Sequence, residues 1–147
     1  MIRAIIVDDE PAARASLKLE IRLHCPEITI VAEADSALTA INTIQANPHF
    51  ELLFLDIQMA DGSGFDVLHN VDTAQFKTIF TTAYSEYALR AIKYTPLDYL
   101  LKPIDAEELK VAVDKALRQQ QSGVQEQIRR YLNQWAGPQV SPRVALA

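Results

Sequence analysis

Short apolar runs alternate along this chain with longer stretches whose apolar residues recur at helical spacing. The runs typical of strands cover residues 2–7, 28–34, 52–55, 77–81 and 99–101. The stretches typical of helices cover residues 11–23, 36–46, 65–70, 86–94 and 106 onward. Strands that alternate with helices predict a parallel sheet with helices on both faces. The predicted fold class is therefore α/β, a doubly wound five-stranded parallel sheet flanked by five helices.

The second predicted helix has an apolar pattern at helical spacing and a signal for its start. Leu38, Ile41 and Ile44 align at helical spacing, as is typical of a helix. Either Asp35 or Ser36 is placed to cap the first turn of this helix.

The pattern is ambiguous beyond Gln119. An apolar helical stripe resumes after Gly123 and continues to Gly137-Pro138; its members are Val124, Ile128, Tyr131, Leu132 and Trp135. One extended C-terminal helix with a weak point at Gly123, or two helices, both fit this pattern. The stripe requires burial on its own domain or against a second copy of the chain. The apolar segment 141–147 has no capping or turn signal, and we interpret it as the opening of a strand in a truncated further domain.

Length, composition and charge narrow the class of protein. The 147 residues correspond to one domain with a short appendage, and 49% are hydrophobic, enough for a core. The apolar runs are far shorter than the roughly 20 residues of a membrane span, and the acids after the first run do not fit a signal peptide. Cys25 is the only cysteine, so an internal disulfide is impossible, and these features together favour the cytoplasm. A net charge of −5 argues against a nucleic-acid surface on this stretch.

Polar residues stand at the carboxyl ends of four of the five predicted strands. Asp8 and Asp9 follow the first strand, Asp56 the third and Thr82 the fourth, and Lys102-Pro103 follows the fifth. In open α/β sheets, ligands bind in the crevice outside the carboxyl ends of the strands. The sequence therefore predicts one site at this edge.

The residue types at this edge suit phosphoryl chemistry. Clustered carboxylates repel one another unless cations neutralise them, and Mg²⁺ is a natural complement to three aspartates. A carboxylate held by Mg²⁺ and Lys102 is a plausible nucleophile, because aspartyl phosphates are a known covalent strategy. The metal and the ammonium group would screen the incoming phosphoryl charge, and Thr82 offers a hydroxyl to one phosphoryl oxygen.

In this order and on these strand ends, the motifs Asp8-Asp9, Asp56, Thr82-Ala83 and Lys102-Pro103 resemble the receiver domain of two-component response regulators. The resemblance covers residues 1 to about 120. The strings "IVDDEPAAR", "FLDIQM", "FTTAYSEYALRAIKY" and "LDYLLKPI" are similar to receivers that precede a LytTR-type DNA-binding domain. The resemblance implies a flavodoxin-like sheet order of 2-1-3-4-5.

The resemblance also implies roles for the metal site. Asp56 would be the phosphoacceptor, loaded from a histidine kinase. Asp9 and Asp56 would ligate Mg²⁺ together with the backbone carbonyl of Gln58, and Asp8 would act mostly through water. Lys102 would hold the phosphoryl group.

The switch residues follow from the same resemblance. Thr82 would hold the phosphoryl group with Lys102, although the neighbouring Thr81 leaves the choice of switch hydroxyl open. Tyr99 would match the aromatic residue that moves inward on activation, and simple core packing is its alternative role. The bond before Pro103 would be cis. The family often has Met-Pro after the acceptor, and here that pair is Met59-Ala60.

The implied protein is a phosphorylation-controlled switch and a regulator, whose only catalysis is its own phosphorylation and dephosphorylation. Residues 1–120 would form the receiver, and residues 121–147 a helical linker and the start of a truncated effector region. Its partners would be a sensor histidine kinase and a second copy, docked through the face of the fourth helix, fifth strand and fifth helix or through the C-terminal helix. Contact with DNA would require the missing C-terminal domain, and no contact with a membrane is expected.

Three alternatives remain at this point. A haloacid-dehalogenase-like phosphatase also uses an aspartate nucleophile, Mg²⁺ and a lysine, but it would place a second aspartate where Gln58 stands. A flavodoxin-type binding module would have a phosphate-binding first loop rich in Ser and Thr, which residues 8–12 lack. A degenerate receiver that works unphosphorylated is disfavoured by the intact acids. We interpret the string 61–64, Asp-Gly-Ser-Gly, as a tight turn and not as a phosphate cradle.

Overall fold

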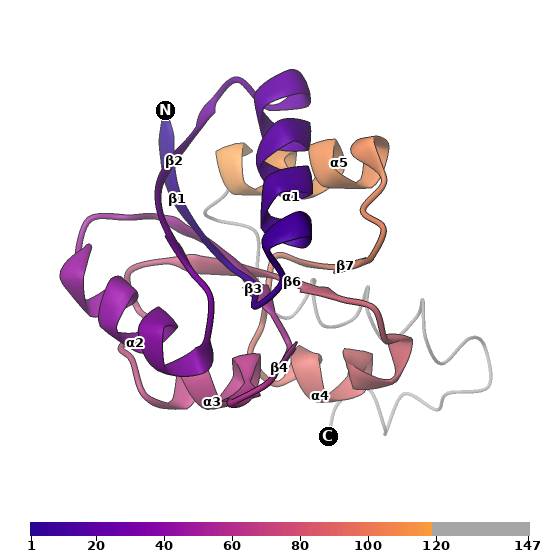
Figure 1. Ribbon diagram of the computed structural model, residues 1–147. Helices are drawn as coiled ribbons and strands as arrows, with labels where there is room; N and C mark the ends of the chain where they lie inside the picture. Colours follow the sequence, from indigo (N-terminus) through magenta and orange to yellow (C-terminus); the bar gives the residue numbers. More distant parts are fainter. Residues whose placement is uncertain (119–147) are drawn as a thin grey trace, which may run out of the picture.

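The computed structural model describes residues 1–118 (Figure 1). The elements are β1 (Ile2–Val7), α1 (Pro11–His24), β2 (Ile28–Ala34), α2 (Ala37–Ala46), β3 (Leu52–Asp56), β4 (Gln58–Met59), β5 (Gly62–Ser63), α3 (Gly64–His69), β6 (Lys77–Thr82), the 3-10 helix η1 (Ser85–Tyr87), α4 (Ala88–Ile92), β7 (Asp98–Leu101) and α5 (Ala106–Arg118). The predicted C-terminal helix, linker and effector segment lie outside the described residues.

Five strands form one parallel sheet in the order β2-β1-β3-β6-β7. These are the five strands predicted from the apolar runs, so the α/β class and the 2-1-3-4-5 order are confirmed. The other two strands, β4 and β5, pair antiparallel in a small separate hairpin, where the sequence predicted only a turn. This hairpin directly follows the strand that ends at Asp56, and so it borders the predicted site.

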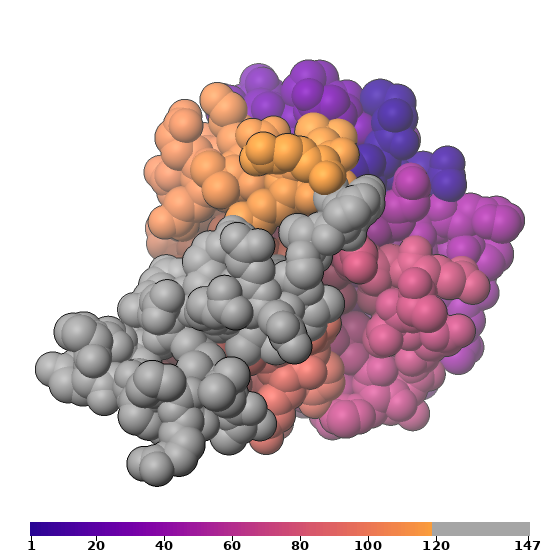
Figure 2. Space-filling view, turned by 180° about the vertical axis from the view of Figure 1, so that it is seen from behind, coloured from indigo at the N-terminus to yellow at the C-terminus, as the bar shows by residue number. Residues whose placement is uncertain are grey.

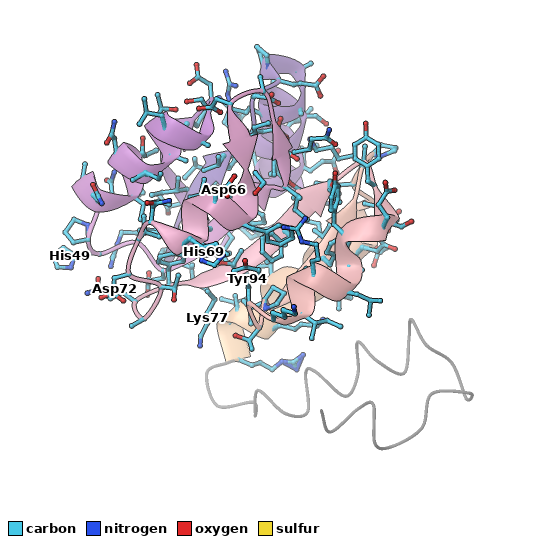
Figure 3. The ribbon with its side chains drawn as sticks, turned by 90° about the horizontal axis from the view of Figure 1, so that it is seen from below. His49, Asp66, His69, Asp72, Lys77 and Tyr94 are labelled. Carbon is cyan, nitrogen blue, oxygen red and sulfur yellow. The ribbon has the colours of Figure 1, made fainter. Side chains whose placement is uncertain are left out.

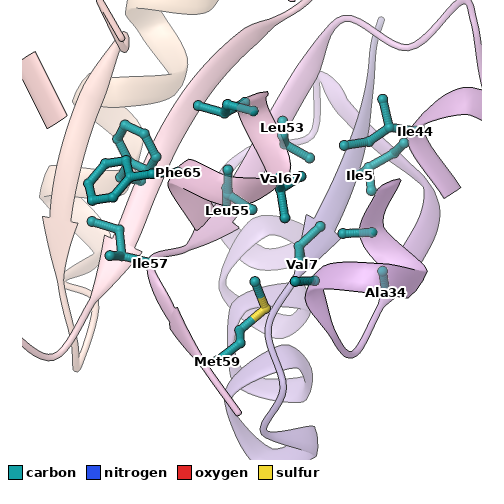
Figure 4. Close-up of a cluster of buried hydrophobic side chains, with 14 of the residues drawn as sticks. Ile5, Val7, Ala34, Ile44, Leu53, Leu55, Ile57, Met59, Phe65 and Val67 are labelled. Carbon is teal, nitrogen blue, oxygen red and sulfur yellow. The ribbon is translucent and has the colours of Figure 1, made fainter. Parts of the chain in front are cut away.

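Helices cover both faces of the sheet (Figure 1). Leu17 and Ile21 of α1 pack in one core cluster with Leu109 and Val113 of α5, and Figure 2 shows α5 in orange beside α1 in violet. The second cluster lies under α2, α3 and α4 and includes Phe65, which Figure 4 shows beside the β3 side chains. Burial on both faces explains why β3 is apolar throughout until Asp56.

The buried face of α2 includes only part of its aligned apolar residues. Leu38 is 64% exposed. Ala37, Ala40 and Ile44 face the core instead, with Ile41 packed at its margin. The small alanines let the helix approach the sheet closely, and apolar periodicity alone does not distinguish this stripe from its neighbour.

The N-cap of α2 is Ser36, which settles the choice between Asp35 and Ser36. The Ser36 hydroxyl accepts a hydrogen bond from the Thr39 backbone N–H at 3.0 Å, and the Thr39 hydroxyl accepts one from the Ser36 N–H at 3.1 Å. This reciprocal arrangement is a capping box, which satisfies two backbone donors at the helix start.

We therefore expect Ser36→Ala to lower the free energy of unfolding by about 1 kcal/mol, because the Thr39 N–H loses its acceptor. Urea unfolding followed by circular dichroism measures this change, and Ser36→Asp, which keeps an acceptor, should stay near the wild-type value. An Ala variant as stable as the wild type would contradict a capping role.

The fourth predicted helix is shorter and more irregular than the pattern 86–94 indicated. It starts as one turn of 3-10 helix, continues for only five residues as α4, and ends before Thr95, whose φ of 47° is in the left-handed region. Proline at position 96 disfavours a helical conformation for the residue before it, which explains the early end. Within residues 1–118 no helix combines the length and apolar character that a bilayer span needs.

Candidate functional site

The carboxyl ends of the parallel strands bring the predicted site residues to one edge of the sheet. Asp8 follows β1 directly, Asp56 ends β3 and Thr82 ends β6. The register aligns Asp56 with Thr81, the next strand residue after Phe80. Lys102 follows β7, and its backbone N–H donates to the Thr82 carbonyl at 2.8 Å. The strand-end argument therefore predicted the location of each of these residues.

Three carboxylates lie close together at this edge of the sheet. Asp8, Asp9 and Asp56 each offer one oxygen, and the three oxygens lie within 4.8 Å of one another. Asp8 and Asp56 are both only 4% exposed, whereas Asp9 is partly exposed. Close, buried carboxylates are costly unless positive charge compensates them.

Backbone donors fix the orientation of two of these acids. The Asp8 carboxylate accepts a hydrogen bond from the Glu10 N–H at 2.9 Å, and the Asp9 carboxylate accepts one from the Ala60 N–H at 3.0 Å. The second bond depends on the departure Met59-Ala60, because a proline at position 60 would have no N–H to donate. The departure from the family pattern thus adds a contact to the acidic cluster, a signal that sequence reasoning missed.

Lys102 provides the compensating charge. Its Nζ lies 2.6 Å from an Asp8 oxygen and 3.4 Å from an Asp56 oxygen. Burial lowers the pKa of Lys102, but the hydrogen bond to Asp8 and the charges of both acids outweigh burial and leave that pKa raised. The ammonium group therefore stays charged between the two carboxylates. The bond between Lys102 and Pro103 is cis, as the resemblance implies.

One lysine does not fully compensate the acids. Burial raises the pKa of Asp56 to about 7; the charge of Asp8 adds to the rise, while Lys102 and a backbone hydrogen bond with Gln58 oppose it. A carboxyl group with this pKa is only partly ionised at neutral pH. A divalent cation among the three oxygens would favour the ionised form, so the donor set fits Mg²⁺, a hard ion that prefers carboxylate oxygens.

Thr82 and Tyr99 meet at the backbone of Tyr84. The fully buried Thr82 hydroxyl accepts a hydrogen bond from the Tyr84 N–H at 3.2 Å, and the Tyr99 hydroxyl donates to the Tyr84 carbonyl. Burial raises the pKa of Tyr99 to about 12, so this hydroxyl keeps its proton. Strand alternation places Thr82 on the same sheet face as Phe80, in the cluster against which Tyr99 packs, whereas Thr81 belongs to the other face. This geometry favours Thr82 over Thr81 as the hydroxyl connected to Tyr99.

Gly64 and Arg14 are two neighbours of the site that sequence reasoning missed. The Gly64 N–H donates to the Ile57 carbonyl at 2.7 Å, and a Cβ on Gly64 would lie 2.6 Å from the Asp56 carbonyl oxygen. The Arg14 guanidinium donates to the Asp8 carbonyl at 2.8 Å. Both contacts join residues that belong to different elements. A single glycine or arginine in a sequence does not indicate which distant backbone group it will contact.

Asp61 belongs to the neighbouring hairpin and not to the acidic cluster. Its carboxylate accepts hydrogen bonds from the Ala37 and Leu38 N–H groups at the start of α2, and these bonds lower the pKa of Asp61. The string 61–64 therefore fastens the hairpin to α2. Ser63 completes it as the N-cap of α3.

A five-stranded parallel sheet in this order, with an aspartate cluster and a lysine at the carboxyl edge, defines the class of receiver domains. The sequence model of the family described as "Response regulator receiver domain" matches residues 4–114. The chain belongs to this family, and it is a receiver domain of two-component response regulators.

Relatives indicate the branch of the family. The chain is 39% identical over 128 residues to the sensory transduction protein LytT of Enterococcus faecalis, covering 85% of this chain and 52% of LytT. It is 40% identical over 124 residues to the transcriptional regulatory protein BtsR of Escherichia coli, covering 83% of this chain and 50% of BtsR. The chain thus spans about half the length of the curated relatives it matches. Among solved structures, the response regulatory domain of mrkE from Klebsiella pneumoniae superposes with a TM-score of 0.71 at 28% identity, covering 79% of this chain and 95% of that domain.

Proposed function

We propose that this domain accepts a phosphoryl group on Asp56 from a sensor histidine kinase, in a reaction that requires Mg²⁺. The observation that carries the proposal is the convergence of three aspartate oxygens within 4.8 Å, with the Lys102 ammonium group between two of them. The 4% exposure of Asp56 limits access by water while leaving its carboxylate at the sheet edge.

In the proposed transfer, one Asp56 carboxylate oxygen forms a bond to phosphorus while the phosphorus–nitrogen bond of the kinase phosphohistidine breaks. The electron pair leaves with the imidazole, which takes up a proton from solvent. Mg²⁺, held by Asp9, Asp56 and the Gln58 carbonyl with Asp8 acting through water, would screen the charge of the phosphoryl oxygens. Lys102 would transfer its contact from the Asp56 oxygen to a phosphoryl oxygen.

Phosphorylation would then shift the conformation through Thr82. The transferred group adds about two negative charges to the edge of the sheet. The Thr82 hydroxyl accepts a bond from the Tyr84 N–H, so its own proton is available to a phosphoryl oxygen. Because the Tyr99 hydroxyl donates to the carbonyl of the same Tyr84, a movement of Thr82 reaches Tyr99 and β7. The coupling is a population shift of roughly one to three kcal/mol between two states.

The output would be dimerisation, through the α4–β7–α5 face or through residues beyond 118. Two relatives named for sensory transduction and transcriptional regulation are about twice as long as the matched region. We infer a LytTR-type DNA-binding output outside this domain, and we place the kinase reaction in the cytoplasm. Molar mass from light scattering, with and without Mg²⁺ and beryllofluoride, tests the dimerisation step.

The transfer itself is tested with a small-molecule phosphodonor. Incubation with phosphoramidate and Mg²⁺ should add one phosphoryl group, located on Asp56 by peptide mass spectrometry, and omission of Mg²⁺ should reduce labelling strongly. Asp61→Asn is the matched control, because this carboxylate lies five residues after Asp56 in the chain and binds the α2 backbone instead. Labelling at another residue, or undiminished labelling without a divalent ion, would refute the proposal.

A further inference from the structure

A side-chain hydrogen bond joins α3 to the end of α4 on the face opposite α1 and α5. The Tyr94 hydroxyl and the His69 Nε2 lie 2.7 Å apart, and Figure 3 shows the two side chains meeting between their elements. His69 is the last residue of α3, and Tyr94 follows α4 by two residues. The bond therefore links α3 to the residues that directly follow α4.

Aromatic packing around this bond makes it part of a rigid contact. The Tyr94 ring stacks on Phe65 with centroids 5.0 Å apart and planes at 17°. The Arg90 guanidinium of α4 lies 4.6 Å from the centre of the same Phe65 ring. Tyr87 of η1 contacts Phe65 edge-on. Phe65 of α3 thus contacts two residues of the η1–α4 segment and also Tyr94 just beyond it, and the His69 bond fixes this far end of the segment.

The two sides of this contact are anchored differently. α3 starts at Gly64, whose N–H is bound to the Ile57 carbonyl, and a capping box at Ser63 completes its first turn. The η1–α4 segment has neither: η1 and α4 lack side-chain caps, and α4 has only five residues. Thus α3 is fixed to the strand that bears Asp56, while the placement of α4 depends on contacts such as the His69 bond.

In the same structure Tyr99 is half-buried, and its hydroxyl is bound to the neighbouring loop. The Tyr99 hydroxyl donates to the carbonyl of Tyr84, the residue immediately before η1. The position of the η1–α4 segment therefore decides whether the Tyr84 carbonyl stands where Tyr99 can reach it. The Tyr94–His69 bond and the Tyr99–Tyr84 bond hold the two ends of one short segment in the same arrangement.

We infer that Tyr94 and His69 are positioning residues that stabilise the conformation in which the Tyr99 hydroxyl binds the Tyr84 carbonyl, and through it the phosphorylated state of the domain. This inference rests on the proposed phosphorylation of Asp56. The bond does not require a particular charge on His69, because Nε2 can accept from the Tyr94 hydroxyl when the ring is neutral and donate to its oxygen when the ring is protonated. The hydroxyl of Tyr94 is therefore the group to test.

The test is the affinity for beryllofluoride at saturating Mg²⁺, measured by NMR titration alongside the free energy of unfolding in urea. Tyr94→Phe keeps the stack on Phe65 and removes only the hydroxyl; it should weaken beryllofluoride binding about five-fold, the effect of one hydrogen bond. His69→Phe should weaken it by a similar factor, the double variant by no more than either single change, and His69→Gln should restore part of the affinity. His49→Gln, on an exposed loop residue, is the matched histidine control.

The outcomes separate this inference from the proposed function. Unchanged or tighter beryllofluoride binding in Tyr94→Phe and His69→Phe, with normal binding by the wild type, would overturn the inference and leave the phosphoacceptor role intact. Loss of stability without loss of affinity would show a merely structural bond and would also overturn it. A wild-type protein that binds no beryllofluoride, or an Asp56→Asn variant that binds it equally well, would refute the proposed function and this inference with it. Should Tyr94→Phe fail to fold, His69→Phe and His69→Gln still decide.

Discussion

Replacing Asp56 by Asn is expected to abolish phosphoryl labelling and, in metal-free buffer at pH 8, to raise the free energy of unfolding by about 4 kcal/mol. The loss of labelling follows because an amide cannot act as the nucleophile. The gain in stability follows because the pKa of Asp56 lies at about 7 in the folded protein, against an ordinary value of 3.8. At pH 8 the folded wild type must hold this carboxylate ionised in a buried site, whereas Asn is neutral and has nearly the same shape.

The pH dependence of this gain has a definite sign. A group whose folded pKa is raised contributes stability fully below its unfolded pKa, and that contribution is lost as pH rises through the folded pKa. For Asp56 the loss begins near pH 4 and is complete above pH 7. The difference between Asp56→Asn and wild type should therefore be small at pH 4 and largest at pH 8. Taking the difference between the free energies of unfolding of the two proteins at each pH removes the contributions of the other carboxylates.

Urea unfolding of both proteins in EDTA between pH 4 and pH 8 measures this difference. Adding Mg²⁺ at pH 8 should stabilise the wild type, by about 2.7 kcal/mol at one hundred times its dissociation constant, and stabilise the variant less. Asp61→Asn serves again as the matched change at a carboxylate whose pKa is lowered, and it should not stabilise the protein. A pH-independent difference, or an Asn variant no more stable than the wild type at pH 8, would show that the pKa of Asp56 is not raised in the folded protein.

The stability that Asp56→Asn is expected to gain shows that the buried acidic cluster destabilises the metal-free domain, and this cost has a functional reason. Asp8 and Asp56 are buried together, and Lys102 is close enough to compensate only part of their charge. A site that waits for a divalent ion and a phosphoryl group needs carboxylates that remain undersatisfied without them. The destabilisation by the ionised Asp56, which Asp56→Asn removes, is the same electrostatic free energy that favours binding of a divalent ion.

Strand-end residues were predictable from the sequence because a parallel sheet has only one carboxyl edge. Asp8, Asp56 and Lys102 each follow an apolar run, and the runs alone gave their common location. The strand order and the layers were predictable for the same reason, since alternating strands and helices leave few topologies.

Contacts between elements were not predictable in this way. The Ala60 N–H that binds Asp9, and the Tyr84 backbone that joins Thr82 to Tyr99, are main-chain groups, which all residue types share apart from the N–H that proline lacks. The alignment of Leu38 with Ile41 and Ile44 predicted a helix but not its buried face, because packing distance to the sheet decides between Ala and Leu faces and no local pattern encodes that distance. Sequence reasoning found the side chains of the site but not the backbone that orients them.

Gly64 is the position where this hidden backbone geometry should have its largest effect on stability. A Cβ at Gly64 would lie 2.6 Å from the Asp56 carbonyl oxygen and 3.0 Å from the Leu55 Cγ, and the first of these is a backbone atom that cannot rotate away. We expect Gly64→Ala to lower the free energy of unfolding by about 3 kcal/mol, because either the start of α3 or the end of β3 must move. Movement of α3 would also lengthen the hydrogen bond from the Gly64 N–H to the Ile57 carbonyl.

The same displacement should reach the chemistry, because Asp56 is the residue that is pushed. In the folded fraction of Gly64→Ala, the rate of phosphoryl labelling should fall at least ten-fold, since a misplacement of about 1 Å at reacting groups has a cost of this order or more. Gly62→Ala, in the hairpin that precedes α3, is the control: its nearest neighbours are the Ala37 Cβ and an Asp66 carboxylate oxygen, both at 3.3 Å, and neither is a backbone atom of β3. Its φ of 156° adds some strain, so it should lose stability but keep its labelling rate. If Gly64→Ala instead labelled at the wild-type rate, the close approach of α3 would not be what positions the Asp56 carboxylate.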